Sequence, residues 1–260
     1  MPEAKKDVAA KKDTLPVLAS QFEEDEGGGF EGADSEAYAI PFLAILQSNS
    51  PQVKKTEAAY IEGAEEGMLI DTVENTVISG PITVIPCFYR RGFVEWVPRD
   101  SGGGFVQEYT ADEAPPTTRD DENRDLLENG NELMDTRYHY VLLVTEDGAT
   151  PIVIAMTRTQ VKKSRRWMSQ MNKIKFPRKK GGTFTPPMYS HAYQLDVVAE
   201  RKDDYSWWNW EIAGKTVLED EEVVAAAKAF HDAVKGGQVK EATDSLNKTE
   251  GSDDEAPPAF

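Results

Sequence analysis

The first clear pattern in the chain lies between residues 68 and 97. Short runs of β-branched and aromatic residues are separated there by glycine, proline and polar turns. These runs cover residues 68–71, 77–78, 82–89 and 92–97. They predict β-strands, because branched and aromatic side chains pack well on a pleated surface. Pro86 falls inside the third run, and since proline has no amide proton to donate, it predicts a sheet edge or a β-bulge there.

Two longer apolar runs follow and predict a β-hairpin. Residues 138–144 and 152–156 are rich in tyrosine, valine, leucine and isoleucine, and the turn-forming residues 146–148 lie between them. Two further strands are expected over 193–199 and 205–212, where apolar and aromatic residues recur with the period of a strand.

The period changes to that of a helix in two places. Val161, Met168 and Met171 recur at near-helical spacing and predict a helix over about 159–174. A second helix is expected near 219–235, and the pair of glycines that follows it provides the stop.

Five or six strands, one inserted helix and one closing helix predict a mainly β fold with two helices. We interpret the pattern as an OB-fold-like Greek-key barrel with long loop insertions, although a sandwich or a split sheet-plus-helix fold would give a similar pattern. The expected domain spans 37–236 and includes a mobile acidic loop over 98–131. Composition predicts a disordered acidic arm over 1–36 and a disordered acidic C-terminal tail over 237–260.

The charge of the chain is strongly segregated along the sequence. There are 46 acidic and 29 basic residues, and the net charge is −17. Residues 158–180 hold ten basic residues and no acidic one, which leaves 19 basic against 46 acidic residues, or −27, elsewhere. The ten are Arg158, Lys162, Lys163, Arg165, Arg166, Lys173, Lys175, Arg178, Lys179 and Lys180.

This basic segment, residues 158–180, has the composition of a nucleic-acid-binding surface. Trp167 and Phe176 lie among its cations, and several cations fall on one face of the expected helix. Cations neutralise phosphates and release counterions, while the bases of a single strand stack on aromatic rings at about 1–3 kcal/mol each. The alternative is a solvated helix face that balances acidic loops within the molecule.

A second candidate patch lies on the predicted strands. Arg90, Arg91, Phe93 and Trp96 are close together in sequence, and OB-folds present such residues to nucleic acid on their strand face and loops. The alternative is that Phe93 and Trp96 belong to the hydrophobic core.

Sequence motifs for catalysis are missing. The chain has no GxxxxGK[ST], HExxH or GxSxG motif, so we expect no enzymatic activity. Cys87 lies in a predicted strand and is expected in the core, and His139, between two tyrosines, is expected to be structural or on the surface. One cysteine and three scattered histidines lack the spacing of zinc ligands, so no metal or other cofactor is expected.

Membrane association is not expected either. No apolar stretch approaches the roughly 20 residues that a bilayer-spanning helix needs. The first residues lack the apolar core of a signal peptide. These features predict a cytoplasmic protein.

The chain ends in an acidic stretch and a terminal aromatic residue. Asp253, Asp254 and Glu255 precede two prolines, and Phe260 joins a ring to an α-carboxylate, a combination that suits an apolar pocket ringed by basic groups. In this tail the chain resembles the single-stranded DNA-binding proteins of bacteria and tailed bacteriophages, and the phage form is closer in size and loop length. Ala259 stands where the bacterial pattern has proline.

The resemblance implies an OB-fold core that binds single-stranded DNA during phage replication or recombination, in the cytoplasm of the host cell. It also implies that the tail recruits replication or recombination proteins. The opposite charges predict that the tail competes with DNA for the basic segment, and self-association stays open. The alternatives are an acidic protein–protein adaptor or virion component without DNA binding, and a binder of RNA or duplex DNA.

Overall fold

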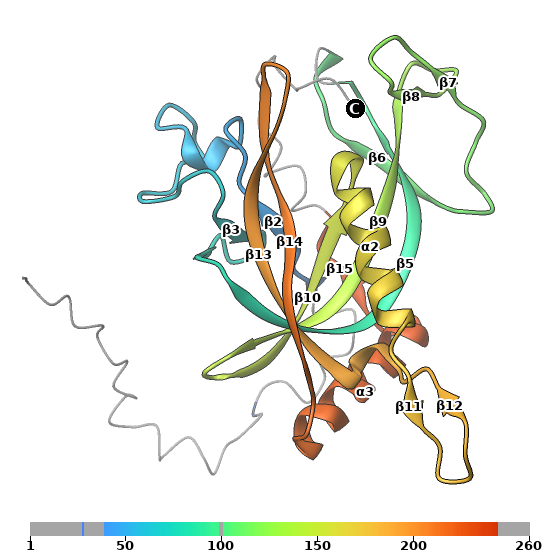
Figure 1. Ribbon diagram of the computed structural model, residues 1–260. Helices are drawn as coiled ribbons and strands as arrows, with labels where there is room; N and C mark the ends of the chain where they lie inside the picture. Colours follow the sequence, from blue (N-terminus) through green and yellow to red (C-terminus); the bar gives the residue numbers. More distant parts are fainter. Residues whose placement is uncertain (1–27, 29–38, 99–100, 244–260) are drawn as a thin grey trace, which may run out of the picture.

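The apolar runs of the chain's centre form one strongly curled antiparallel sheet, seen in a computed structural model that describes residues 28, 39–98 and 101–243 (Figure 1). Five of its strands follow one another across the curl in the order β14-β13-β5-β9-β10. They are β5 (Ile82–Trp96), β9 (Glu132–Thr145), β10 (Gly148–Met156), β13 (His191–Lys202) and β14 (Tyr205–Val217).

The connections identify the fold class. In chain order the five strands are β5, β9, β10, then helix α2 (Val161–Asn172), then β13 and β14, and β13 returns to pair with the start of β5. This is the strand order of an OB-fold, a five-stranded and partly open Greek-key barrel. Among the described strands β10 and β14 are not paired, and α2 contacts both across the opening. The predicted OB-like, mainly β fold with two helices is therefore confirmed.

Strand β5 is continuous where the sequence predicted two strands. Its register against β9 shifts between Pro86 and Phe88, which is the β-bulge that Pro86 predicted. A bulge adds one residue to the strand and so shifts the alternation of its side chains by one position. Each side chain beyond the bulge therefore points to the face opposite the one that it would have in a strand without a bulge. Val84 faces the interior of the curl before the bulge, and Tyr89 faces the same interior after it.

Two hydrophobic cores lie on the two faces of this sheet. The inner core fills the hollow of the curl and includes Trp167 and Met171 of α2. The outer core lies on the other face, where α3 (Glu221–Lys235) packs Ala227 and Phe230 against the sheet beside Phe42. The Asp220 side chain caps α3 by accepting hydrogen bonds from two backbone amides of its first turn.

Shorter elements complete the described chain. Two small sheets lie beside the curl, a three-stranded antiparallel one and a parallel pair that joins the two ends of the described chain. The first contains β2 (Leu43–Ile45), β3 (Leu69–Asp71) and β4 (Val77–Ile78), and the pair consists of β1 (Ala39–Ile40) and β15 (Lys240–Glu241). The remaining elements are η2 (Pro51–Val53), η4 (Arg158–Gln160), η5 (Met188–Ser190), and the hairpin strands β11 (Phe176–Pro177) and β12 (Thr183–Phe184).

Regular structure extends beyond two of the predicted boundaries. The segment expected as a mobile loop over 98–131 carries β6 (Phe105–Thr110), β7 (Thr118–Arg119) and β8 (Asp125–Leu126), and β6 and β8 pair with β5 and β9. The segment expected as tail from 237 begins with β15. Backbone pairing with partner strands, which local composition does not reveal, accounts for both differences.

Candidate nucleic-acid interface

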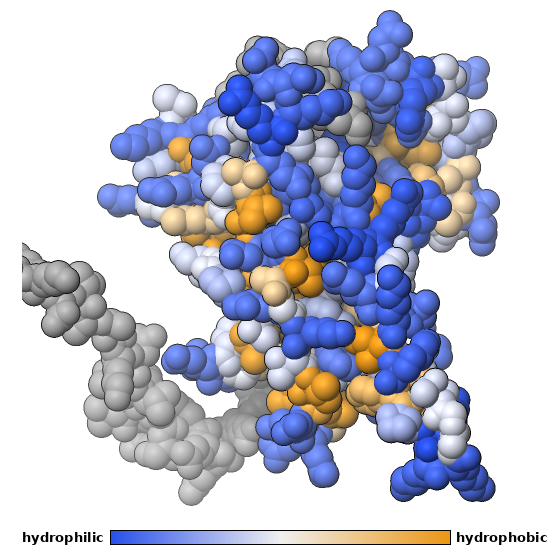
Figure 2. Space-filling view, in the orientation of Figure 1, coloured by the Kyte–Doolittle hydropathy of each residue, from blue (hydrophilic) through white to orange (hydrophobic). Residues whose placement is uncertain are grey.

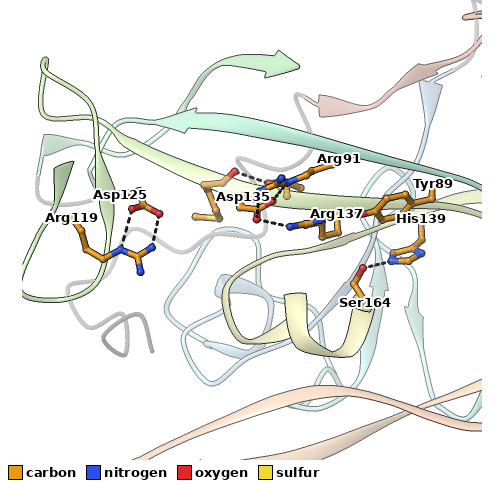
Figure 3. Close-up of polar contacts among 10 residues, drawn as sticks. Tyr89, Arg91, Arg119, Asp125, Asp135, Arg137, His139 and Ser164 are labelled. Carbon is orange, nitrogen blue, oxygen red and sulfur yellow. Dashed lines mark hydrogen bonds and ion pairs between the residues drawn. The ribbon is translucent and has the colours of Figure 1, made fainter. Parts of the chain in front are cut away.

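Helix α2 presents one face to the inner core. Ser164, Trp167 and Met171 are spaced at i, i+3 and i+7 and are all buried. The ring of Trp167 stacks on His139 of β9 with centroids 4.8 Å apart, and His139 Nε2 lies 2.8 Å from Ser164 Oγ (Figure 3). These contacts hold the helix firmly across the open side of the barrel.

The opposite face of α2 is cationic and exposed. Lys162, Arg165, Arg166 and Lys173 all point outward, on a face that is roughly 16 Å long at the rise of an α-helix. The helix has no acidic residue in its first turn, so nothing negative offsets the partial positive charge of its N-terminus. The predicted helix, and the predicted alignment of its cations on one face, are both observed.

The cationic surface continues into the β11–β12 hairpin, which projects from the body beyond the end of α2 (Figure 1). Arg178 lies over the ring of Phe184 at 5.3 Å, and Phe176 meets the same ring edge-on at 6.0 Å. Lys179 and Lys180 are exposed at the tip. In Figure 2 the tip of the projection is hydrophilic.

Most cations of the basic segment have no carboxylate partner. Arg158 pairs with Glu132 at 2.8 Å, and Lys163 pairs with Glu200 at 2.8 Å and Glu211 at 3.5 Å. Two of the ten are thus neutralised, and none of the other eight makes an ion pair within residues 39–98 and 101–243. Within the described residues, internal balancing of the segment therefore involves two cations of the ten, and the carboxylates that pair with them lie on strands β9, β13 and β14.

Trp167 is placed differently from the prediction. We expected it to stack on a base, but its exposed fraction is 0%, inside the inner core. The helical period explains this, because residue 167 lies on the face opposite Lys162 and Arg166. Phe176 is half-buried between Phe184 and His191, so part of its ring stays accessible.

The second candidate patch is split between the two faces of β5. Arg90 points to the outer face, where it bonds Glu108, Tyr140 at 3.0 Å and Glu241 at 3.1 Å, and lies over the ring of Tyr138. Trp96 is 9% exposed on the same face. Arg90 is engaged in these contacts and Trp96 packs in the outer core, so the expected joint surface is not formed.

Arg91 and Phe93 lie on the inner face of β5 and remain accessible. The guanidinium of Arg91 sits over the Phe93 ring at 4.6 Å and forms two 3.0 Å bonds to Asp135 of β9. Arg137 donates to the same carboxylate at 2.7 Å and to Tyr89 at 2.8 Å (Figure 3). Tyr89, Asp135 and Arg137 were not among the residues expected at the site. Their alternate spacing on two paired strands, which places them on one face with Arg91, is the pattern that could have indicated them.

Two buried titratable residues have strongly shifted pKa values. His139 is fully buried, and burial, with the nearby Arg137 charge, lowers its pKa to about 3, so the ring is neutral near pH 7. Burial also raises the pKa of the Cys87 thiol to about 12, which leaves little nucleophilic thiolate. Cys87 lies in the core as expected, and His139, which was expected to be structural or on the surface, is fully buried.

No cluster of three histidine, cysteine or acidic side chains that could hold a metal ion occurs within the described chain. None of its helices has the length and apolarity that a membrane span requires. The predicted tail residues Asp253, Asp254, Glu255 and Phe260 lie outside the described residues.

The fold and this surface define an OB-like barrel protein with a segregated cationic face. Residues 10–240 match the profile of the Pam3 phage gp34-like protein family, so the chain belongs to this family of bacteriophage proteins. No curated protein and no solved structure matches the chain.

Proposed function

We propose that this phage protein binds single-stranded DNA along the outer face of α2 and the β11–β12 hairpin, without catalysing a reaction. The observation that carries the proposal is the group of eight exposed cations with no carboxylate partner in the described chain. So many like charges on one exposed surface attract a polyanion, whose phosphates would pair with them and release counterions. Binding of this kind would protect and organise single strands during replication or recombination.

The route of the strand differs from that in a typical OB-fold. OB-folds bind oligonucleotides on the face of their second and third strands, which are β9 and β10 here. The outer residues of these strands, such as Tyr140, Leu142 and Val153, are buried in the outer core with Phe230 of α3. With this face covered, the strand is proposed to follow the helix that spans the opening.

Half-buried aromatic rings favour a single strand over a duplex. Phe176 and Phe184 stand beside Arg178 on the hairpin, and Phe93 stands beside Arg91 on the sheet. Unpaired bases can stack on such rings, whereas the bases of a duplex are already stacked on one another. The phosphates between them would be neutralised by the cations of α2.

The test is the binding of a fluorescein-labelled dT oligomer, followed by anisotropy over a series of salt concentrations. If roughly six phosphates are neutralised, the slope of log affinity against log salt is about −4 for a single strand. A duplex of the same length should bind more weakly. No binding of either would overturn the proposal and favour the adaptor role, and a preference for duplex would overturn the single-strand assignment.

A paired set of variants localises the site. Arg165→Glu with Arg166→Glu should reduce affinity at least a hundredfold, because four units of charge change on the proposed surface. The matched control is Lys55→Glu with Lys215→Glu, which makes the same charge change at exposed residues outside α2 and the hairpin. Equal losses in both variants would show that only net charge matters and not this surface.

A further inference from the structure

A cavity opens beside Gln160, the residue that precedes α2. Its volume is about 210 Å³, and its walls come from β2 and the loop after it, the ends of β5 and β10, the start of β9, and Trp210 of β14. Pockets for drug-sized ligands are roughly 300–1,000 Å³. The cavity therefore suits a smaller flat molecule of the size of a single ring system.

The lining of the cavity is uncharged and partly aromatic. None of its residues is acidic, basic or histidine, while Trp96, Tyr138 and Trp210 supply aromatic walls. A phosphate or another ion would lose its hydration there without gaining a countercharge. A neutral heterocycle would lose little hydration energy and would gain contacts with the aromatic rings.

Two carboxamides at the cavity are free to bind a ligand. The Gln47 amide is already used, because it donates to the Trp208 carbonyl and accepts from the Trp208 amide, each at 2.9 Å. By contrast, the half-buried side chains of Asn49 and Gln160 make no hydrogen bond within the described chain. A carboxamide offers a donor pair and an acceptor together, which complements the polar edge of a nucleobase.

The position of the cavity connects it to the basic segment. Gln160 ends η4 and precedes α2, so Arg158 and Lys162 flank it in the chain. Arg158 has a φ of +48°, a left-handed conformation that is uncommon outside glycine, and its side chain is held by Glu132 at 2.8 Å. Backbone strain of this kind concentrates at ligand sites.

We propose that this cavity receives one nucleobase of the single strand that follows the basic face of α2, with Asn49 and Gln160 as its hydrogen-bonding residues. The inference rests on the proposed function and adds a base site to a surface that otherwise contacts phosphates. It predicts that part of the affinity depends on the bases themselves.

The experiment compares a dT 20-mer with an abasic phosphodiester 20-mer of the same length, using anisotropy with the full-length protein. The wild type should prefer the dT oligomer, and Asn49→Ala with Gln160→Ala should reduce this preference about tenfold, as expected for two lost hydrogen bonds. Affinity for the abasic oligomer should stay within about twofold. Gln194→Ala, at an exposed glutamine of β13, is the control and should change neither.

The outcomes separate the two proposals. If the double variant keeps the whole preference for bases, the cavity is not a base site, and a protein side chain becomes its better occupant. If the wild type binds both oligomers equally, the base site fails while the phosphate surface stands. If it binds neither, both proposals fail. The single variants Asn49→Ala and Gln160→Ala should each give part of the effect and guard against loss of folding in the double variant.

Discussion

At the scale of single residues, neighbouring positions of α2 have opposite roles. Arg166 is exposed on the cationic face, and Trp167, the next residue, is fully buried against His139 and Tyr193. A helix turns by about 100° per residue, so adjacent side chains leave it in very different directions. The tryptophan therefore anchors the surface that its neighbours present to solvent.

This placement predicts that Trp167 affects stability and not binding. Trp167→Phe should lower the free energy of unfolding by about 1–3 kcal/mol, because part of a tightly packed ring is removed. Affinity for a dT oligomer should remain within twofold while the protein is folded. Urea denaturation and anisotropy measure the two quantities. A large loss of affinity at unchanged stability would show that the ring contacts DNA.

At the scale of elements, one buried carboxylate adds to the backbone pairing that holds the segment 101–131 to the sheet. Glu95 of β5 is 2% exposed and accepts hydrogen bonds from Tyr109 at 2.7 Å and from Asn131 at 2.6 Å, and Asn129 and Gln107 also donate to it. These bonds, that of Tyr109 foremost, lower the pKa of Glu95 to about 2. The ionised form thus ties β6 and the turn before β9 to β5.

The pKa of Glu95 predicts a pH dependence of stability. The pKa of Glu95 in the folded protein lies below its ordinary value of 4.5, so the ionised carboxylate stabilises the fold fully at pH values above 4.5. This stabilisation is lost as the pH falls through about 2. Glu95→Gln should lower the free energy of unfolding by about 2 kcal/mol at neutral pH. The difference from wild type should shrink between about pH 4.5 and pH 2. Denaturation across this range measures it, and a constant difference would contradict the assignment.

At the scale of the whole molecule, opposite charges lie at opposite ends. The basic hairpin projects at one end, and β7 and β8 lie at the other (Figure 1). Residues 101–131 carry eight acidic residues and two arginines, a balance of −6, and both arginines pair with aspartates of the same segment. This acidic end repels phosphate, so a bound strand should be confined to α2 and the hairpin.

The same separation predicts an effect of the acidic C-terminal residues on binding. Deleting 249–260 removes four acidic residues and Phe260. If these residues compete with DNA for the basic segment, affinity for a dT oligomer should rise several-fold at low salt, and the gain should fade as salt screens the charges. Anisotropy at two salt concentrations tests this. Unchanged affinity at low salt would mean that the acidic residues do not compete.

Much of the architecture follows from local patterns. The hairpin of β9 and β10, helix α2 and helix α3 lie close to the residues where apolar periodicity predicted them, because each pattern reports one face packed on a core. The bulge at Pro86 was also predictable, since it follows from the missing amide proton. The basic segment was visible because its lack of acidic residues is a property of the linear chain.

Tertiary structure alone decided which of these residues share a surface. The bulge at Pro86 reverses the direction of the side chains beyond it, and so it sends Arg90 into ion pairs on the outer face and leaves Arg91 on the inner one. The pairing of β13 with β5, and the cavity between Asn49 and Gln160, bring together residues distant in the chain. Local sequence encodes where strands and helices form and how charge is spread, but contacts between distant segments depend on the packing of the whole chain.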